Sequence, residues 1–162
     1  MFRNFLLYSF ITLSMTSCIN IDITTSKILV ETDTQTTIEF EHMEYTIKID
    51  KPVYTQNDEV HASFFITNTT FDTFEAEIQE GLPYRWELLN SKGVKILSSR
   101  PSGSLQMMNY MISSKYTVRY DFIIDFFQIN GQGKSLSSGY YTLSISLNYP
   151  DAIGVAITIY VK

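Results

Sequence analysis

The chain has 162 residues, 44% hydrophobic and 18% charged, which suits one globular domain with a leader and leaves no room for a second domain. Twelve basic residues against 17 acidic ones give a net charge of −5, and the basic residues are scattered along the chain. We therefore expect neither a nucleic-acid partner nor a polybasic membrane-binding patch, since both need clustered lysines and arginines.

The first 17 residues have the pattern of a secretory signal peptide. Arg3 precedes an apolar run over residues 5–13, and small and polar residues follow it. The run is too short to span a bilayer as a permanent helix. The only cysteine of the chain, Cys18, comes directly after Ser17.

Ser17 and Cys18 together resemble a bacterial lipoprotein signal. The resemblance implies cleavage before Cys18 and acylation of this residue, which would anchor the protein to a membrane through lipid. The alternatives are ordinary signal cleavage, which leaves Cys18 as an unpaired thiol, and an uncleaved leader. The residue after the cysteine is Ile19, whereas an aspartate at this position would resemble an inner-membrane retention signal. This favours the outer membrane of a bacterial cell envelope, with the protein facing the periplasm or the exterior.

Residues 18–42 are interpreted as the lipidated N-terminus and a tether. The segment is rich in threonine and acidic residues, has no glycine or proline, and contains only short apolar clusters. It leaves room for one strand near residues 37–40. The alternative is that the segment pairs with the domain as an added edge strand.

Residues 43–162 are expected to form the domain, because short alternating segments and turn residues succeed one another. Where the alternation is lost, over 123–128, we expect a helical turn. Strands are predicted over residues 45–49, 60–66, 74–78, 84–88, 94–97, 105–112, 116–122, 139–149 and 155–161. The fold class is therefore all-β, an immunoglobulin-like antiparallel β-sandwich of seven to nine strands.

The strand over residues 139–149 is the centre of this prediction. Bulky residues alternate there with small or polar ones, a period of two that places all the bulk on one face. We expect the inward side chains to be Tyr141, Leu143, Ile145, Leu147 and Tyr149.

The order of motifs resembles the bacterial BsuPI-type domain, named for an intracellular proteinase inhibitor. The matching segments are Tyr54, residues 59–60, 65–70, 84–88, 93–94 and 139–143. The resemblance implies a sandwich, a tyrosine corner at Tyr141 and protease inhibition, although no inhibitory loop can be transferred to this chain. Trp86 and Phe64 are expected to fill the space that a disulfide occupies in antibody domains.

Residues that could carry chemistry are few. Residues 131–135 end like a phosphate-binding loop, but Gln128 stands where that motif needs glycine, so a plain loop is expected. His42 and His61 are expected at the surface. Asp121 and Asp125 would meet if their segment were helical, and would lie about 13 Å apart in a strand. We expect no metal and no cofactor.

Three methionines, Met107, Met108 and Met111, cluster around Tyr110. We favour a core strand for this segment. A binding patch is the alternative, because methionine adapts to varied partners.

The sequence predicts a non-enzymatic binding or assembly module whose partner is another protein of the cell envelope, because loops on a rigid sandwich commonly carry function. The alternatives are a BsuPI-like protease inhibitor and a hydrolase that uses Asp121 and Asp125. The candidate binding residues lie in three predicted loops: Glu80, Gly81, Leu82 and Pro83; Arg100, Pro101 and Ser102; and Gln132 and Lys134.

Overall fold

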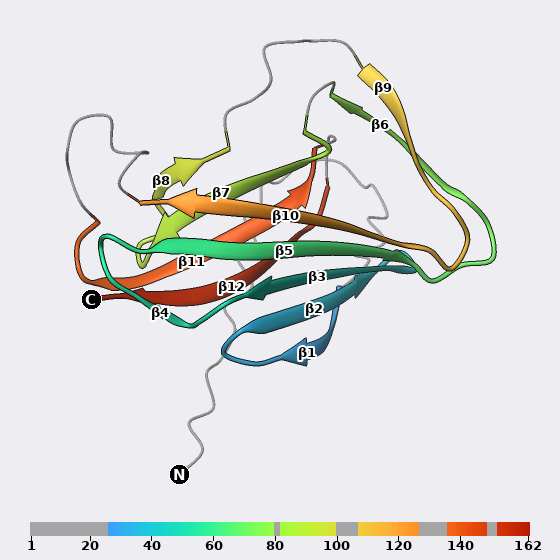
Figure 1. Ribbon diagram of the computed structural model, residues 1–162. Coiled ribbons are helices and arrows are strands. Elements are labelled where there is room, and N and C mark those ends of the chain that lie inside the picture. Colours follow the sequence, from blue (N-terminus) through green and yellow to red (C-terminus); the bar gives the residue numbers. More distant parts are fainter. Residues whose placement is uncertain (1–25, 80–81, 100–106, 127–135, 149–151) are drawn as a thin grey trace, which may run out of the picture.

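The computed structural model describes residues 26–79, 82–99, 107–126, 136–148 and 152–162, and these form twelve strands (Figure 1). The strands of the first half are β1 (Lys27–Glu31), β2 (Gln35–Phe40), β3 (Met43–Ile49), β4 (Val53–Tyr54), β5 (Glu59–Asn68) and β6 (Phe74–Gln79). Those of the second half are β7 (Tyr84–Asn90), β8 (Lys95–Ser98), β9 (Met107–Ile112), β10 (Thr117–Asp125), β11 (Gly139–Leu147) and β12 (Gly154–Val161).

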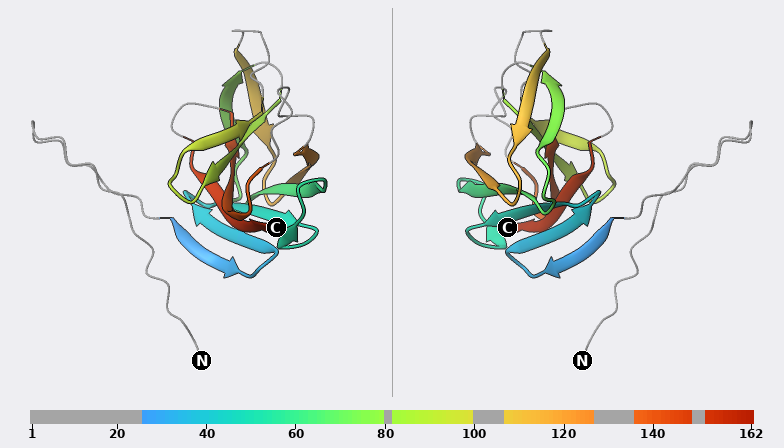
Figure 2. Two further views of the ribbon diagram at one scale, coloured as in Figure 1. Left: turned by 90° about the vertical axis from the view of Figure 1, so that its left-hand side faces the viewer. Right: turned by 90° about the vertical axis from the view of Figure 1, so that its right-hand side faces the viewer.

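The strands form two five-stranded sheets and a two-stranded ribbon. The first sheet has the order β1-β2-β3-β5-β10, the second has the order β4-β12-β11-β7-β8, and the ribbon pairs β6 with β9. The two sheets pack face to face, with β12 against β2 and β3. Figure 2 shows the β6–β9 ribbon and the β1–β2 hairpin on opposite sides of the molecule. The predicted β-sandwich is confirmed, with more strands than the seven to nine expected.

The segment predicted to be a tether contributes two of the additional strands. β2 pairs with β3 over its whole length, and Ile38 is buried against Tyr45 and the rest of the core. A tight turn at Glu41 and His42, both with positive φ, joins the two strands. The tether interpretation is therefore wrong from Lys27 onward, and the edge-strand alternative applies. Residues 1–25, with Cys18, lie outside the described residues.

The central strand, β11, is as the sequence predicts. Tyr141, Leu143, Ile145 and Leu147 are buried between β12 and β7, while Tyr149 lies outside the described residues. Val155, Ile157, Ile159 and Val161 of β12 and the inward residues of β5 complete this part of the core. The Tyr141 hydroxyl donates a hydrogen bond of 2.8 Å to the Ser137 carbonyl oxygen, which confirms the tyrosine corner.

Aromatic rings join the two sheets at the side where β10 faces β7. Tyr84 lies 5.1 Å from Tyr120 between ring centroids, and Trp86 stacks on Phe122 at 6.5 Å. Trp86 thus packs against the core, and Phe64 is fully buried, as expected.

One expectation for β10 is wrong. The helical turn predicted over 123–128 is strand as far as Asp125, because β10 keeps its pairing with β5 to that residue; residues 127–128 lie outside the described part. Tyr116 is 60% exposed, because it precedes β10 in a turn where Lys115 has positive φ.

The methionine cluster is not part of the core. β6 and β9 pair in a register that places Met107 and Met111 opposite Gln79 and Glu75 on one face, and Met108 with Tyr110 on the other. The three methionines are 47%, 46% and 62% exposed in chain order, whereas Ile78 and Ile112 are buried. The core interpretation fails because only part of one face of a two-stranded ribbon packs against the sandwich.

Asn68 fixes the bend between the sandwich and this ribbon. Its side chain is fully buried, and its amide nitrogen donates to the carbonyl oxygens of Asp72 at 2.7 Å and of Ile112 at 3.0 Å. Its amide oxygen accepts hydrogen bonds from the backbone nitrogen and the hydroxyl of Thr70 at 2.9 and 2.7 Å. One side chain thereby satisfies polar groups of the connection between β5 and β6 and of β9, where regular pairing is interrupted.

Replacing Asn68 with alanine is expected to lower the free energy of unfolding by about 3 kcal/mol, because four hydrogen bonds are lost, one of them the buried bond to the Ile112 carbonyl oxygen. Asn109→Ala, at an exposed position of β9, is the control and should change stability by less than about 0.5 kcal/mol. Urea denaturation of both variants measures the difference. Equal midpoints would show that Asn68 does not hold the bend.

Candidate functional site

The predicted loop residues fall largely outside the described part of the chain. The predicted site residues that lie outside the described part are Cys18, Glu80, Gly81, Arg100, Pro101, Ser102, Gln132 and Lys134. Of the predicted loop residues, Leu82 and Pro83 are described, directly before β7. Leu82 is 48% exposed, and the Pro83 carbonyl oxygen accepts a hydrogen bond of 2.9 Å from the Asn148 backbone nitrogen. This contact brings the start of β7 beside the end of β11.

The two aspartates considered for acid/base chemistry stay apart. Asp121 and Asp125 lie on the same outward face of β10, four residues apart, and a strand places such residues about 13 Å apart. Asp121 instead accepts hydrogen bonds from the Ser63 hydroxyl at 2.5 Å and from Arg119 Nε at 2.9 Å. These donors, first Ser63 and then Arg119, hold the pKa of Asp121 below its usual value.

Both histidines are exposed, as expected. His61 lies on the outer face of β5, where its Nε2 is 3.6 Å from a carboxylate oxygen of Glu59. His42 lies in the turn between β2 and β3. In the described part of the chain, no three histidine, cysteine or acidic residues lie close enough together to hold a metal ion. That same part contains no helix with the length and apolar character needed to cross a membrane.

The outer face of the second sheet carries a continuous set of uncharged side chains, most of which bear a hydroxyl group. β11 and β12 pair so that their outward residues form four rows, in the order Tyr140–Tyr160, Thr142–Thr158, Ser144–Ala156 and Ser146–Gly154. Side-chain size falls from one end to the other. At about 3.4 Å per residue, the rows extend over about 20 Å. We call these eight residues the hydroxyl strip.

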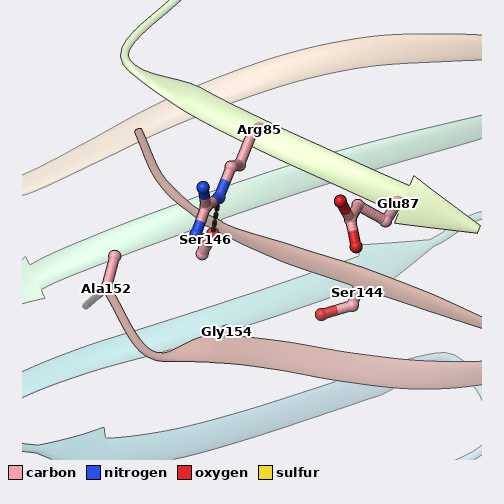
Figure 3. A pocket seen from close by; sticks show the side chains of 6 residues that line it. All are labelled: Arg85, Glu87, Ser144, Ser146, Ala152 and Gly154. Atoms are coloured by element: carbon pink, nitrogen blue, oxygen red, sulfur yellow. Dashed lines mark hydrogen bonds between the residues drawn. The ribbon is translucent and has the colours of Figure 1, made fainter. Parts of the chain in front are cut away.

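A polar groove lies at the small end of the hydroxyl strip, with a volume of about 240 Å³ (Figure 3). Its lining consists of Arg85 and Glu87 from β7, Ser144 and Ser146 from β11, and Ala152 and Gly154 at the start of β12. The register of β7 and β11 sets Arg85 opposite Ser146 and Glu87 opposite Ser144. The groove therefore has a floor of small residues and one charged wall.

The charged wall is held by two polar contacts. Arg85 Nε donates to Ser146 Oγ at 3.2 Å, which leaves the other guanidinium N–H groups directed to the groove and solvent. Glu87 accepts a hydrogen bond of 2.9 Å from Lys95 Nζ on β8. The groove thus presents fixed donors at one position and a fixed acceptor at the next, which suits a polar ligand of defined shape.

Gly154 keeps the floor of the groove open. A Cβ atom at this position would lie 3.0 Å from Ser144 Oγ and 3.3 Å from the Ile145 carbonyl oxygen. Any larger residue would displace the Ser144 hydroxyl and fill the space beneath Arg85. Glycine at this position thus allows Ser144 Oγ and the Ile145 carbonyl oxygen to lie close to the β12 backbone.

A second depression of about 240 Å³ lies between β12 and the β1–β2 turn. Ala156, Ile157 and Thr158 line one side, and Glu31, Thr32, Asp33 and Thr36 line the other. β4 pairs only with Tyr160 and Val161, so the edge of β12 along this depression has no neighbouring strand in the described residues.

The polar groove was not predicted from the sequence, in which Arg85 and Glu87 alternate with Trp86. A signal was present in the outward positions of β11 and β12, which are serine, glycine and alanine where exposed strands commonly carry larger polar residues. That signal becomes useful only with the pairing register of three strands, which the sequence does not give.

No family model and no curated protein matches the chain. Among solved structures, a β-glucosidase from Listeria innocua is 10% identical, with a TM-score of 0.44 over 76% of this chain and 16% of that chain. The alkylpurine DNA glycosylase AlkC of Pseudomonas fluorescens is 7% identical, with a TM-score of 0.47 over 70% of this chain and 28% of that chain. The C-terminal domain of wzt is 15% identical, with a TM-score of 0.43 over 73% and 70% of the respective chains.

The chain thus spans about a sixth of the β-glucosidase that it matches. Structural similarities this weak do not indicate what the chain binds or catalyses. The site therefore has to be interpreted from its own residues.

Proposed function

We propose that this protein is a lipid-anchored, non-enzymatic binding module of the bacterial cell envelope, and that it binds its ligand in the polar groove. The leader and Cys18 support the anchor. The single observation that supports binding is the groove itself, where Arg85 and Glu87 stand fixed over a floor kept open by Gly154.

The groove has the properties of a recognition site on a rigid scaffold. Its side chains stand on three neighbouring strands of one sheet, so their spacing is set by backbone pairing. A ligand entering the groove meets donors from Arg85, the Ser144 hydroxyl and an acceptor from Glu87. Preorganised groups of this kind lose little conformational entropy on binding.

The proposal predicts that a photo-crosslinking residue placed at Ala156 in living cells captures the ligand. Ala156 is exposed and lies in the hydroxyl strip beside the groove. Arg85→Ala should reduce the yield of the adduct about tenfold or more, because a hydrogen bond from a charged donor contributes roughly 1.5–3 kcal/mol. Gel electrophoresis of the irradiated cells, with detection of the protein, measures the yield.

Arg119→Ala is the matched control. Arg119 is also an exposed strand arginine whose Nε donates to an outward oxygen, in this case of Asp121, but it lies on the first sheet. It should leave the adduct unchanged. The proposal fails if no adduct forms at Ala156, or if both arginine variants reduce it equally.

A further inference from the structure

The hydroxyl strip extends beyond the polar groove, and its far end is aromatic. Tyr140 is 64% exposed, and its ring lies 4.9 Å from that of Tyr160 between centroids, at an interplanar angle of 55°. Tyr160 is partly buried and its hydroxyl lies 3.2 Å from Ser138 Oγ. The exposed ring of Tyr140 thus packs against a ring whose hydroxyl is itself hydrogen-bonded.

From the geometry of this face we infer that the hydroxyl strip binds a neutral polysaccharide chain, with one sugar ring stacked on Tyr140 and another in the polar groove. The inference rests on the proposed function and names the chemical class of its ligand. A pyranose ring has an apolar face of C–H groups and a rim of hydroxyls. The strip offers a π-face for the first and, for the second, hydroxyl groups that can both donate and accept hydrogen bonds.

The dimensions of the strip favour an extended chain over a small molecule. From the Tyr140 row to the Ser146 row the strip is about 20 Å long, which accommodates several sugar residues in a line. The two rows between carry Thr142, Thr158, Ser144 and Ala156, which are too small to interrupt a chain lying along the strands. The narrow outward side chains thus form a shallow track between the tyrosines and Arg85.

Charge argues for a neutral ligand. The hydroxyl strip contains no lysine, arginine, aspartate or glutamate, and the groove at its end has Arg85 beside Glu87. Glu31 and Asp33 line the depression on the other side of β12. A polyanion such as a nucleic acid or an acidic polysaccharide would find Arg85 and Lys95, the latter already paired with Glu87, beside three carboxylates, whereas polyanion binding depends on several unpaired cations.

The outward face also argues against a peptide strand as the occupant. A peptide that adds to a sheet pairs with backbone groups at an edge, whereas β11, which carries Tyr140 and half of the strip, is paired on both sides. The free edge of β12 runs along the second depression, whose lining shares Ala156 and Thr158 with the strip.

The test is affinity electrophoresis of the full-length mature protein in mild detergent, through gels that contain dextran, mannan, laminarin or, as the polyanion, alginate. At least one neutral polysaccharide is expected to retard the protein, and alginate is not. Tyr140→Ala should raise the dissociation constant for the polysaccharide about tenfold, because it removes the exposed stacking surface. Gly154→Val should weaken binding similarly, because it fills the floor of the groove.

Tyr116→Ala is the matched control for Tyr140→Ala, because Tyr116 is 60% exposed and lies on the far side of the sandwich from the strip. The Tyr116→Ala variant should migrate through each polysaccharide gel as the unchanged protein does. Circular dichroism of each variant confirms that the fold is retained.

The inference is overturned if none of the three neutral polysaccharides retards the protein, if alginate alone does, or if Tyr140→Ala and Tyr116→Ala behave alike. These outcomes are separable from failure of the proposed function. An Arg85-dependent adduct at Ala156 without retardation by polysaccharide would leave a binding module whose ligand belongs to another class. Loss of that adduct would remove the proposed function itself.

Discussion

Replacing Leu143 with alanine is expected to lower the free energy of unfolding by about 3 to 4 kcal/mol. Leu143 is fully buried at the middle of β11, where it lies opposite Leu88 of β7 on one side and Ile157 of β12 on the other. The substitution removes three carbon atoms from a site whose neighbours are fixed by strand pairing on both sides. The cavity cannot collapse easily, and a loss of this size is a large part of the roughly 5–15 kcal/mol that stabilises a typical domain.

The measurement is urea denaturation of a fragment that starts at Ile19, which retains β1 and β2. Thr142→Ala is the control, because Thr142 neighbours Leu143 in the chain but points to the outer face. It should cost less than about 1 kcal/mol. A similar loss in both variants would mean that β11 does not have the packing described above.

Replacing Cys18 with alanine is expected to abolish incorporation of radioactive palmitate and to release the protein from membranes. In the proposed anchor the sulfur atom would carry the first lipid, and without it the chain would have no acyl group to bury, at about 0.8 kcal/mol per CH₂. Membrane fractionation of cells and autoradiography of the labelled protein measure the two effects.

Ser17→Ala keeps a small residue before the cysteine and should leave labelling and fractionation unchanged. Label that persists in Cys18→Ala would refute acylation at this residue.

The same anchor limits the position of the domain. Eight residues lie between Cys18 and Lys27 at the start of β1, and nine steps along the chain of about 3.3 Å each reach no further than about 30 Å. Acylation at Cys18 would therefore hold the sandwich close to the bilayer.

The proposed ligand site and this anchor are independent of each other. The groove and the hydroxyl strip belong to the second sheet, whereas the chain enters the fold at β1, an edge of the first sheet. A Cys18 variant that no longer reaches the membrane should therefore still be retarded by the same polysaccharide, which makes the released protein a convenient form for binding measurements.

The sequence by itself determined the strands whose two faces differ strongly. In β5, β11 and β12, bulky and polar residues alternate over seven residues or more, and each inward side chain is buried where the structure describes it. The hairpin of β7 and β8 also follows from local chemistry, because Gly93 adopts the positive φ that its turn requires. These features depend on neighbours within a few residues, so a single sequence contains them.

Only the tertiary structure decided the weaker elements. β2 buries Ile38 and two threonines, and its strand character depends on β3 as a partner, so its threonine-rich sequence looked like a tether. The methionines of β9 are apolar yet exposed, because the ribbon with β6 extends beyond the surface that the sandwich offers. The hydroxyl strip and the polar groove arise from the register of β7, β11 and β12. A one-residue slip would turn every one of these side chains inward, and register is set by packing between distant segments, which local pattern does not encode.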